Sequence, residues 1–581
     1  MITFLSRLAE TSQLTLPNFV RLIRGETTYD PRLNKDLYEL PGPPTDNLSD
    51  EWGRWNEVVR HGVIPEWLPH RPPNQARRPR NHGSINDHLP QVWRHIRKGQ
   101  KDGRYLVLKA SMVDHWAELF ISPVGVVNKA GAVPLDIRLI NDYSFPEGES
   151  VNDYTDRSHL PGISYNPPGD IARRIFTLRR DHAYARILLM LGDVAGAFRH
   201  VPVNADNVHM FAFIIGEYLV IDLSCGFGWR VAGSGYDALA QSPCQGLFWC
   251  DDHTCIEIDD GPRCFIANLA LRRAMATVLG PTAINERKFT DWNERGRALG
   301  YEWNTQDGTV TIPADKILRD QRNIAAILAA GTVTKTSALS LLGSLRHITT
   351  CCPPARAFFQ RVQDMARRIS RYGRRHVTAE AMEDLKWLQL ILQNSDRFNS
   401  IPVDHFGNMA APTVHVQMDA SNDGLCALEP SLRQFIRVKF TEAEQQMFTT
   451  DMSVNSINVR ELQSAVLAAL HWGPIWSARS PHRPIHVCFW IDNAVAVSWT
   501  QRRTSRQPLA QLYNRLIALA EFNYSLVCTA EHVPGVENIM ADAGSRAWSN
   551  EDPLFDTWTN LSNGWTQITG AKYRAHWKQW E

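Results

Sequence analysis

Short apolar runs separated by turn residues dominate residues 96–315, and this pattern predicts β-strands. In "ARILLMLGDVAGAF" an unbroken apolar run at residues 187–191 predicts a buried strand that ends at Asp193. "HMFAFIIGEYLVIDL" predicts two strands joined at a Gly-Glu pair. "LFWCDDHTCIEI" predicts a hairpin with Asp251 and Asp252 near its tip. We therefore expect this part of the chain to be rich in strands.

The apolar spacing becomes helical over residues 316–395, where leucines recur at intervals of three and four. "NSDRFNSIPVDHFGNMAAPT" follows and predicts a linker. Beyond it, "VHVQMDAS" and "IHVCFWIDN" predict strands on either side of a helix, "VRELQSAVLAALHW". Residues 1–95 are rich in Pro, Trp and Arg with little clear period, and the tail at 549–581 has no assignment.

Strand alternation places two acids after the linker on the polar side of their strands. Val414, Val416 and Met418 share one face, so Asp419 points to the other. Asp492 follows "IHVCFWI" and falls opposite its apolar face. Glu461 opens the intervening helix. It has an alternative explanation, because Asn458 as N-cap with Glu461 three residues later is a capping arrangement.

Composition narrows the classes of partner. The net charge is +1, but Arg and Lys gather in runs such as "RHIRKGQKDGR" and "RVQDMARRISRYGRRH". Local basic patches beside acidic sites fit a nucleic-acid channel, although solvated helix faces explain any single run equally well. Ten cysteines without a CxxC pair, no signal peptide and no apolar run of membrane length predict an intracellular chain, cytoplasmic or nuclear, without a membrane partner.

The adjacent acids Asp251 and Asp252 allow two interpretations. Asp is a common turn residue. Alternatively, like charges side by side indicate a cation between them, and Mg²⁺ prefers carboxylate oxygen. If Asp193 converges on this pair from a neighbouring strand, the three carboxylates would hold two Mg²⁺ ions for an in-line phosphoryl displacement. Upstream, Lys129 and Arg138 lie on an expected hairpin that would grip a triphosphate.

Four sequence blocks in order resemble a retroelement reverse transcriptase: "VVNK…IRLINDYSFP…SVND", "DVAGAF", "WCDDH" and "ERKFTDW…ALGYEW…VTIPADK". The resemblance implies that Asp193, Asp251 and Asp252 are metal-binding catalytic acids. It places Phe198 where the family excludes a ribose 2′-hydroxyl, and Arg138 and Lys129 where it holds the triphosphate. It also places Lys288 at a proposed general acid for pyrophosphate. Taken singly, Phe198 is better explained as a core residue and Lys288 as a solvated lysine, whereas Arg138 fits a surface ion pair and a ligand-binding residue equally well.

One block departs from that family. Where a Pro-Phe-Gly and then a Ser-Pro pair are usual, this chain has "LSCGFGWRVAGSGYDAL". Phe227 and Gly228 match, whereas Cys225-Gly226 replaces the proline context and a Gly-Ser-Gly replaces Ser-Pro. Because glycine has more backbone freedom to lose, the departure puts the efficiency of polymerisation in question, and not the fold.

A second resemblance lies beyond the predicted linker. Asp419, Glu461, Asp492 and Asp542 occur in the order of the metal-binding acids of ribonuclease H, and "HVPGVENIMADAGSR" is similar to the end of that domain in retroelements. His532 would assist product release, or is an ordinary surface histidine. The residues of these blocks are most similar to the corresponding sequences of DIRS-like retrotransposons.

The expected fold class is multidomain α+β: a right-hand polymerase (fingers, palm, thumb) followed by an α/β ribonuclease H-like domain with a mixed five-stranded sheet.

The expected function is RNA-directed DNA polymerase with ribonuclease H activity, using two Mg²⁺ per site with Mn²⁺ as an alternative. The implied partners are RNA template, DNA primer, RNA–DNA hybrid and dNTPs. The alternatives are a decayed or domesticated nucleic-acid-binding protein and a nuclease with an inactive polymerase half. The expected divisions are 1–95 (arm and start of fingers), 96–315 (fingers and palm), 316–395 (thumb and connection), 396–412 (linker), 413–548 (ribonuclease H-like) and 549–581 (unassigned).

Overall fold

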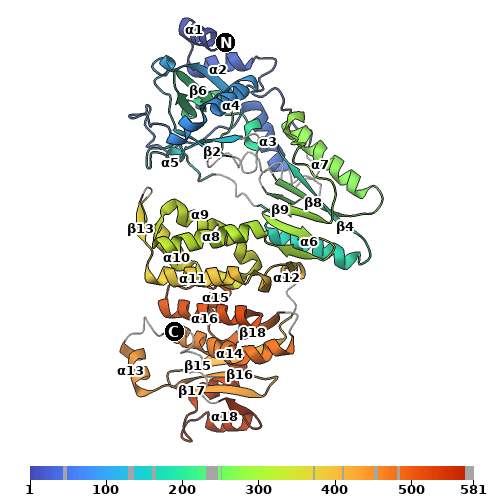
Figure 1. The fold of residues 1–581 in the computed structure, drawn as a ribbon, viewed down its shortest axis with the longest axis vertical. Coiled ribbons are helices and arrows are strands. Elements are labelled where there is room, and N and C mark those ends of the chain that lie inside the picture. The colour runs from blue at the N-terminus through green and yellow to red at the C-terminus, as the bar shows by residue number, and fades with distance from the viewer. Residues whose placement is uncertain are drawn as a thin grey trace. The chain divides into compact units, whose positions relative to one another are not determined.

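The computed structural model describes residues 1–42, 49–128, 136–159, 165–229, 247–249, 252–370, 373–407, 411–450, 456–480 and 484–568. The chain divides into two compact units, Met1–Leu299 and Gly300–Glu581. Each unit combines helices and sheets around its own buried apolar cluster (Figure 1). The mixed α/β, multidomain class expected from the sequence is therefore confirmed, while the six finer divisions stay predictions.

The first unit contains a three-stranded antiparallel sheet in the order β1-β6-β5. β5 (Ala212–Ile215) and β6 (Tyr218–Asp222) are the two strands predicted from "HMFAFIIGEYLVIDL". The apolar residues of β1 (Tyr105–Lys109) are buried because α1 (Ile2–Ser12) and α4 (Leu89–Lys101) both pack against it. The first 95 residues, which showed little period, thus contribute helices to this core, including α2 (Leu16–Arg24) and α3 (Ser49–His61).

A second antiparallel sheet in this unit has the order β4-β8-β7. β4 (Ile187–Asp193) ends at the residue that its apolar run predicted. β7 (Leu247–Trp249) and β8 (Asp252–Ile258) are the two sides of the predicted hairpin. α6 (Pro168–Asp181) and α7 (Arg263–Leu279) both contact β8, and Figure 1 shows α7 alongside β8. Because helices cover it, the sheet holds the end of β4 in a fixed, largely buried position.

Four shorter elements also belong to the first unit. The expected hairpin around Arg138 is present as β2 (Val124–Asn128) paired with β3 (Ile137–Asn141). α5 (Val151–Tyr154) begins with a capping box in which Ser150 accepts from the Asp153 amide. β9 (Arg295–Ala298) contacts β4.

The second unit begins with the helices predicted for residues 316–395: α8 (Ala314–Ala330), α9 (Lys335–Cys351), α10 (Gln360–Arg367) and α11 (Ala379–Gln393). Leu342, Leu345, Leu385 and Leu388 are buried on their inner faces. Leu339, at the same helical spacing, is about half exposed, so spacing alone overstated the apolar face. β12 (Thr332–Thr334) and β13 (Arg374–His376) form an antiparallel pair beside these helices.

The segment at 396–412, predicted as a linker, carries structure of its own. β14 (Ile401–Pro402) pairs with β11 (Thr309–Thr311), which in turn pairs with β10 (Tyr301–Asn304). The Asn399 side chain accepts from the Ile312 amide at 2.7 Å, and α12 (Asp404–Gly407) follows. Its polar composition predicted a turn-rich connection, but pairing with a distant strand anchors it.

The second unit also holds a six-stranded mixed sheet with the order β19-β18-β15-β16-β17-β20. α14 (Ile457–Arg479) contacts β15 and packs on α16 (Pro508–Tyr524). α15 (Ala494–Arg502) contacts β19, and α17 (Ile539–Arg546) contacts β15 and β16. α13 (Glu442–Thr450) lies between β17 and α14 in the chain. The five strands before the tail are β15 (Val414–Ala420), β16 (Gly424–Glu429), β17 (Gln434–Lys439), β18 (Ile485–Ile491) and β19 (Leu526–His532).

The tail that the sequence left unassigned supplies a sixth strand. The expectation of a five-stranded sheet is therefore wrong, because the sheet has six strands. β20 (Thr566–Ile568) pairs with β17, parallel. Before it, α18 (Phe555–Leu561) places Trp558 edge-on to Phe435, with ring centroids 4.9 Å apart. The Arg437 guanidinium lies over the Trp548 and Trp558 rings, at 4.0 and 4.4 Å. The tail is therefore part of this domain's apolar core.

No helix among the residues described is both long enough and apolar enough to cross a lipid bilayer.

Candidate active sites

In the first unit, Asp193 and Asp252 stand directly opposite one another. β4 and β8 pair in antiparallel register from Ile187 with Ile258 to Asp193 with Asp252. Directly opposed residues of antiparallel strands have Cβ atoms about 4.5–5.5 Å apart. Two carboxylates at that separation repel one another unless a cation is near. The register, which no single strand could predict, thus converts two distant acids into a pair.

A cation and an amide already contact Asp193. Lys288 Nζ donates to Asp193 Oδ2 at 2.6 Å, and Asn285 Nδ2 donates to Oδ1 at 2.5 Å. Asp193 is nearly fully buried, whereas the Lys288 side chain is about half exposed. The sequence singled out Lys288 as a proton donor, and the structure brings it to this carboxylate. Asn285 was missed, because an isolated Asn in the segment between α7 and β9 carries no sequence signal.

Phe198 lies between core and surface. It is 9% exposed and belongs to the main apolar cluster of the unit. Its ring meets Phe227 edge-on at 5.4 Å, and Phe227 is itself 44% exposed. This position is compatible with a core residue and with a residue at the edge of a site. The exclusion of a ribose 2′-hydroxyl by Phe198 stays a prediction.

Three of the quoted sequence blocks converge around Gly228. Asn152 Nδ2 donates to the Gly228 carbonyl oxygen at 2.9 Å. Gly228 has a φ of 103°, and a Cβ there would lie 2.7 Å from the Asn141 carbonyl oxygen. Only glycine fits such a position. Phe227-Gly228, where the chain matches the family pattern, is therefore held by "IRLIND" and "SVND". The Gly-Ser-Gly departure lies outside the described residues.

The triphosphate-binding prediction is placed only in part. Arg138 is exposed on β3, opposite Val127 of β2. Lys129 and Asp251 lie outside the residues that the structure describes. The first site is therefore defined by Asp193, Asp252 and Lys288, with Arg138 on a separate hairpin of the same unit.

In the second unit, Asp419, Glu461 and Asp492 converge. Each offers a carboxylate oxygen within 4.8 Å of the others. Asp419 lies near the end of β15, Glu461 in the first turns of α14, and Asp492 directly after β18. β15 and β18 are parallel neighbours, so their carboxyl ends meet at one edge of the sheet. The three acids line a hollow of about 310 Å³, together with Asn422 and Arg546 among others.

Burial and mutual repulsion hold these acids in an unfavourable charge state. Burial raises the pKa of Asp419 to about 7, and the Asp492 and Asp542 charges add to the rise. A hydrogen bond donated by the Ser545 hydroxyl to Asp419 Oδ2 opposes it. Burial, followed by the Asp419 and Asp492 charges, also raises the pKa of Glu461 well above its usual value. Perturbed carboxylates in a hollow are typical of functional sites.

The capping explanation for Glu461 is wrong. The N-cap of α14 is Ser456, and no side chain caps it. Glu461 Oε1 instead accepts from the Ala420 amide at 2.9 Å. The other carboxylate oxygen, Oε2, is buried without a hydrogen-bond partner among the described residues. Asn458 accepts from Asn493 Nδ2 at 2.7 Å rather than capping the helix.

Asp542 and His532 border this cluster. Asp542 lies on α17 and accepts from Arg546 Nε at 2.6 Å. His532 is the exposed last residue of β19 and pairs in register with Ile491, the residue before Asp492. A Cβ on Gly535 would lie 3.9 Å from Asp492 Oδ2, so the chain after His532 runs past that carboxylate. Asp542 is thus near enough to raise the pKa of Asp419 by its charge, but it is not one of the three acids that lie within 4.8 Å of one another.

The residues present fit a divalent cation. Three carboxylates within reach of one ion and an orphaned buried oxygen on Glu461 are the donor set that Mg²⁺ or Mn²⁺ takes. A cation there would replace the protons that otherwise keep the cluster stable. Ser545 and Arg546 were missed by the sequence, although both lie in the quoted "ADAGSR"; serine and arginine next to an acid give no signal until the fold shows their contacts.

Arginines of the basic run "RVQDMARRISRYGRRH", which was interpreted as fitting a nucleic-acid channel, are partly engaged within the unit. Arg361 Nη1 lies 3.3 Å from Glu383 and 3.6 Å from the buried Asp384. Arg515 of α16 also lies 3.5 Å from Asp384. These contacts attach the helical part to the sheet part and leave fewer charges for a nucleic acid.

No protein-family model matches the chain, and no curated protein matches it. Among solved structures, it is similar to a foamy viral protease-reverse transcriptase dRH in complex with double-stranded DNA (TM-score 0.44, 12% identity, 89% of this chain and 82% of that one). It is also similar to a foamy viral protease-reverse transcriptase with RNA/DNA hybrid (0.41, 11%, 89% and 63%) and to one with double-stranded DNA (0.42, 12%, 85% and 98%). At these TM-scores and identities the likeness does not establish a family or an activity for the chain.

Proposed function

We propose that the chain is an RNA-directed DNA polymerase with ribonuclease H activity from a DIRS-like retrotransposon. The observation that carries the proposal is the presence of two carboxylate sites, one in each unit, at the acids that the two resemblances implied. They are Asp193 opposite Asp252, and the cluster of Asp419, Glu461 and Asp492. In this proposal the first unit contains fingers and palm, and the second contains thumb, connection and ribonuclease H-like domain.

In the first site, Asp193, Asp251 and Asp252 would hold the divalent ions, Mg²⁺ with Mn²⁺ as an alternative. Such ions supply charge stabilisation for the attacking and leaving oxygens of phosphoryl transfer. Arg138 and Lys129 would bind the dNTP triphosphate, and Arg suits it because of its bidentate geometry. Lys288 would give a proton to the departing pyrophosphate, and its hydrogen bond to Asp193 supports a role beside the ions. Phe198 would pack against the deoxyribose.

In the second site, Asp419, Glu461, Asp492 and Asp542 would hold the ions that serve cleavage of RNA in an RNA–DNA hybrid. Ser545 fixes the orientation of Asp419 through its hydroxyl, and the Ala420 amide fixes Glu461. The exposed His532 would assist release of the product. The two activities belong together, because copying an RNA template from a DNA primer leaves a hybrid whose RNA has to be removed.

The proposal is tested by primer extension with the purified chain, an oligo(dT) primer, poly(rA), labelled dTTP and Mg²⁺. Incorporation by the wild type, and none by Asp252→Asn, would support polymerisation at this site. A folded wild type that incorporates nothing in Mg²⁺ or Mn²⁺ would overturn it.

A nuclease without polymerase activity is the second candidate. The cluster of Asp419, Glu461 and Asp492 favours it, because these three carboxylates and the orphaned Glu461 oxygen already form a donor set for a divalent cation. Hybrid cleavage without primer extension would select this candidate. Neither activity in a folded chain would select the nucleic-acid-binding alternative.

A further inference from the structure

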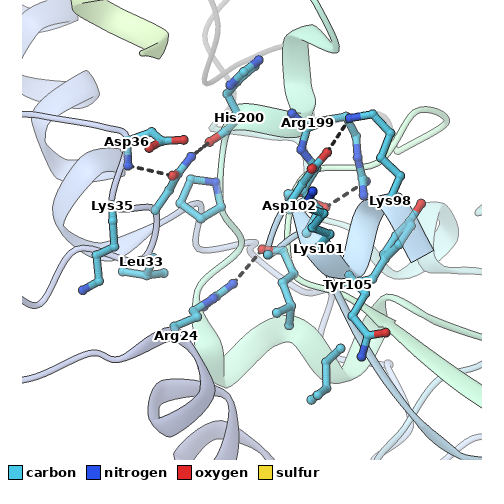
Figure 2. A pocket seen from close by; sticks show the side chains of 18 of the residues that line it. Arg24, Leu33, Lys35, Asp36, Lys98, Lys101, Asp102, Tyr105, Arg199 and His200 are labelled. Atoms are coloured by element: carbon cyan, nitrogen blue, oxygen red, sulfur yellow. Dashed lines mark hydrogen bonds and ion pairs between the residues drawn. The ribbon is translucent and has the colours of Figure 1, made fainter. Parts of the chain in front are cut away.

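The first unit contains a pocket lined by cationic side chains, and neither proposed activity uses it. It has a volume of about 760 Å³. One wall comes from the end of α4 and the start of β1, where the basic run "RHIRKGQKDGR" lies, and another from the turn after β4. Figure 2 shows Lys98 and Lys101 on one side and Lys35 and Asp36 across from them.

Four of its cations are already balanced. Arg24 Nη2 donates to the Val203 and Leu223 carbonyl oxygens at 2.8 and 2.6 Å, and its Nη1 lies 3.5 Å from a Glu26 oxygen. Arg199 donates to the Asp222 carboxylate at 2.6 Å, and Lys98 donates to the Asp102 carboxylate at 2.7 Å. Lys35 Nζ donates to the Asp30 carbonyl oxygen at 3.0 Å and lies 3.3 Å from its carboxylate.

Arg104 and Lys101 are different. Among the described residues, neither side chain makes a hydrogen bond or an ion pair. Lys101 is exposed, but Arg104 is only partly exposed, and its guanidinium lies against the turn at Gly196, where a Cβ would be 3.2 Å from Nη1. Burial and then the nearby Arg199 charge lower the pKa of Arg104, and the Asp102 and Asp222 charges oppose this shift without reversing it. A half-buried guanidinium beside a second guanidinium is unfavourable unless an anion satisfies its donors.

The dimensions and lining indicate the kind of anion. Pockets of 300–1,000 Å³ take small ligands. Arginine is suited to phosphate because its donors match two phosphate oxygens, and a lysine adds a point charge. The buried Leu33 and Leu106 offer apolar surface for a ring. The Asp36 carboxylate offers an acceptor for a sugar hydroxyl or a base amine.

We propose that this pocket binds a free nucleotide, with its phosphates against Arg104 and Lys101. The site is separate from Asp193 and Asp252, but its wall includes Ala195 and Gly196 of the segment between Asp193 and Phe198. A bound nucleotide would therefore contact the chain that positions both. The inference does not depend on either proposed activity, because it requires only binding.

The test is calorimetric titration of the full chain with ATP in EDTA, since binding at a carboxylate site would need a divalent ion. We expect saturable binding that weakens about tenfold or more in Arg104→Gln, the scale for a charged hydrogen-bonding group. Arg97→Gln on α4, an exposed arginine outside the pocket, is the matched control and should bind as the wild type. Lys101→Gln, which is too exposed to affect folding, should weaken binding in the same direction.

The result that would overturn the proposal is absence of saturable binding, or binding that neither Arg104→Gln nor Lys101→Gln weakens. A short single-stranded oligonucleotide forms the second arm. If it binds and depends on Arg104 while ATP does not bind, the pocket contacts nucleic-acid backbone and the free-nucleotide proposal is wrong. If the wild type showed no primer extension, this inference would still stand, because the binding measurement does not depend on polymerase activity.

Discussion

The two carboxylate sites balance their charge in different ways. In the first unit, Asp193 contacts a lysine and an amide, and the opposed Asp252 is exposed to water. In the second, Asp419, Glu461 and Asp492 lie close together, and none of them forms an ion pair with a basic side chain among the described residues. The pKa of both Asp419 and Glu461 is raised. The comparison teaches that Lys288 partly neutralises the first site in the absence of a metal ion. The negative charges of the second site need bound protons or a cation to be neutralised.

The largest expected effect separates the sites completely. Asp492→Asn should lower hybrid cleavage by about 10³-fold or more, the scale of losing one group that stabilises transition-state charge, and should leave primer extension unchanged. Asp252→Asn should do the reverse. Asp556→Asn, an exposed acid of α18, is the control and should retain both activities. If either site variant lost both activities while folded, the comparison between two independent sites would fail.

The next prediction concerns the lysine that distinguishes the first site. Lys288→Met should reduce primer extension by about 10²-fold, as expected for removal of a general acid, with hybrid cleavage unaffected. Lys288→Arg should retain more synthesis because the charge on Asp193 is kept. The exposed Lys109 of β1 provides a matched Lys→Met control. Equal synthesis by the wild type and Lys288→Met would show that the contact with Asp193 is merely structural.

Metal should stabilise the second site because it replaces unfavourable protons. At a Mg²⁺ concentration about 100 times its Kd, the wild type should gain about 2.7 kcal/mol against local unfolding. Hydrogen exchange of α14 amides would measure this gain. Glu461→Gln, which removes the acid with the orphaned oxygen, should lose most of it. An unchanged gain in Glu461→Gln would show that Mg²⁺ acts elsewhere.

The smallest effect is on pH dependence without metal. The folded-state pKa of Asp419, about 7, lies above its ordinary value, so the folded protein binds more protons than the unfolded chain between about pH 4 and 7. Stability should therefore fall as pH rises through that interval, by about 1–2 kcal/mol. Urea unfolding in EDTA at about pH 5 and pH 8 measures the fall, and Asp419→Asn should reduce it. A stability that rises over this interval in both proteins would contradict the charge argument.

Periodicity predicted the local elements well where one face is buried. β4, the β5–β6 and β7–β8 pairs, the helices after residue 313 and the inward face of β15 follow from apolar spacing, because burial of that face is what stabilises each element. The tail was missed because its strand and helix are short, and their stability comes from packing against Phe435 and Arg437, which are distant in sequence.

By itself, the sequence determined which carboxylates are candidates, because the acids follow apolar strands in a recognisable order. Only the tertiary structure decided which of them meet. Strand register placed Asp193 opposite Asp252, and parallel pairing of β15 with β18 brought Asp419 to Asp492. It also decided what contacts them, such as Lys288 at Asp193 and Ser545 at Asp419. The physical reason is that charge interactions depend on distance and burial, and both are set by contacts between residues far apart in the chain.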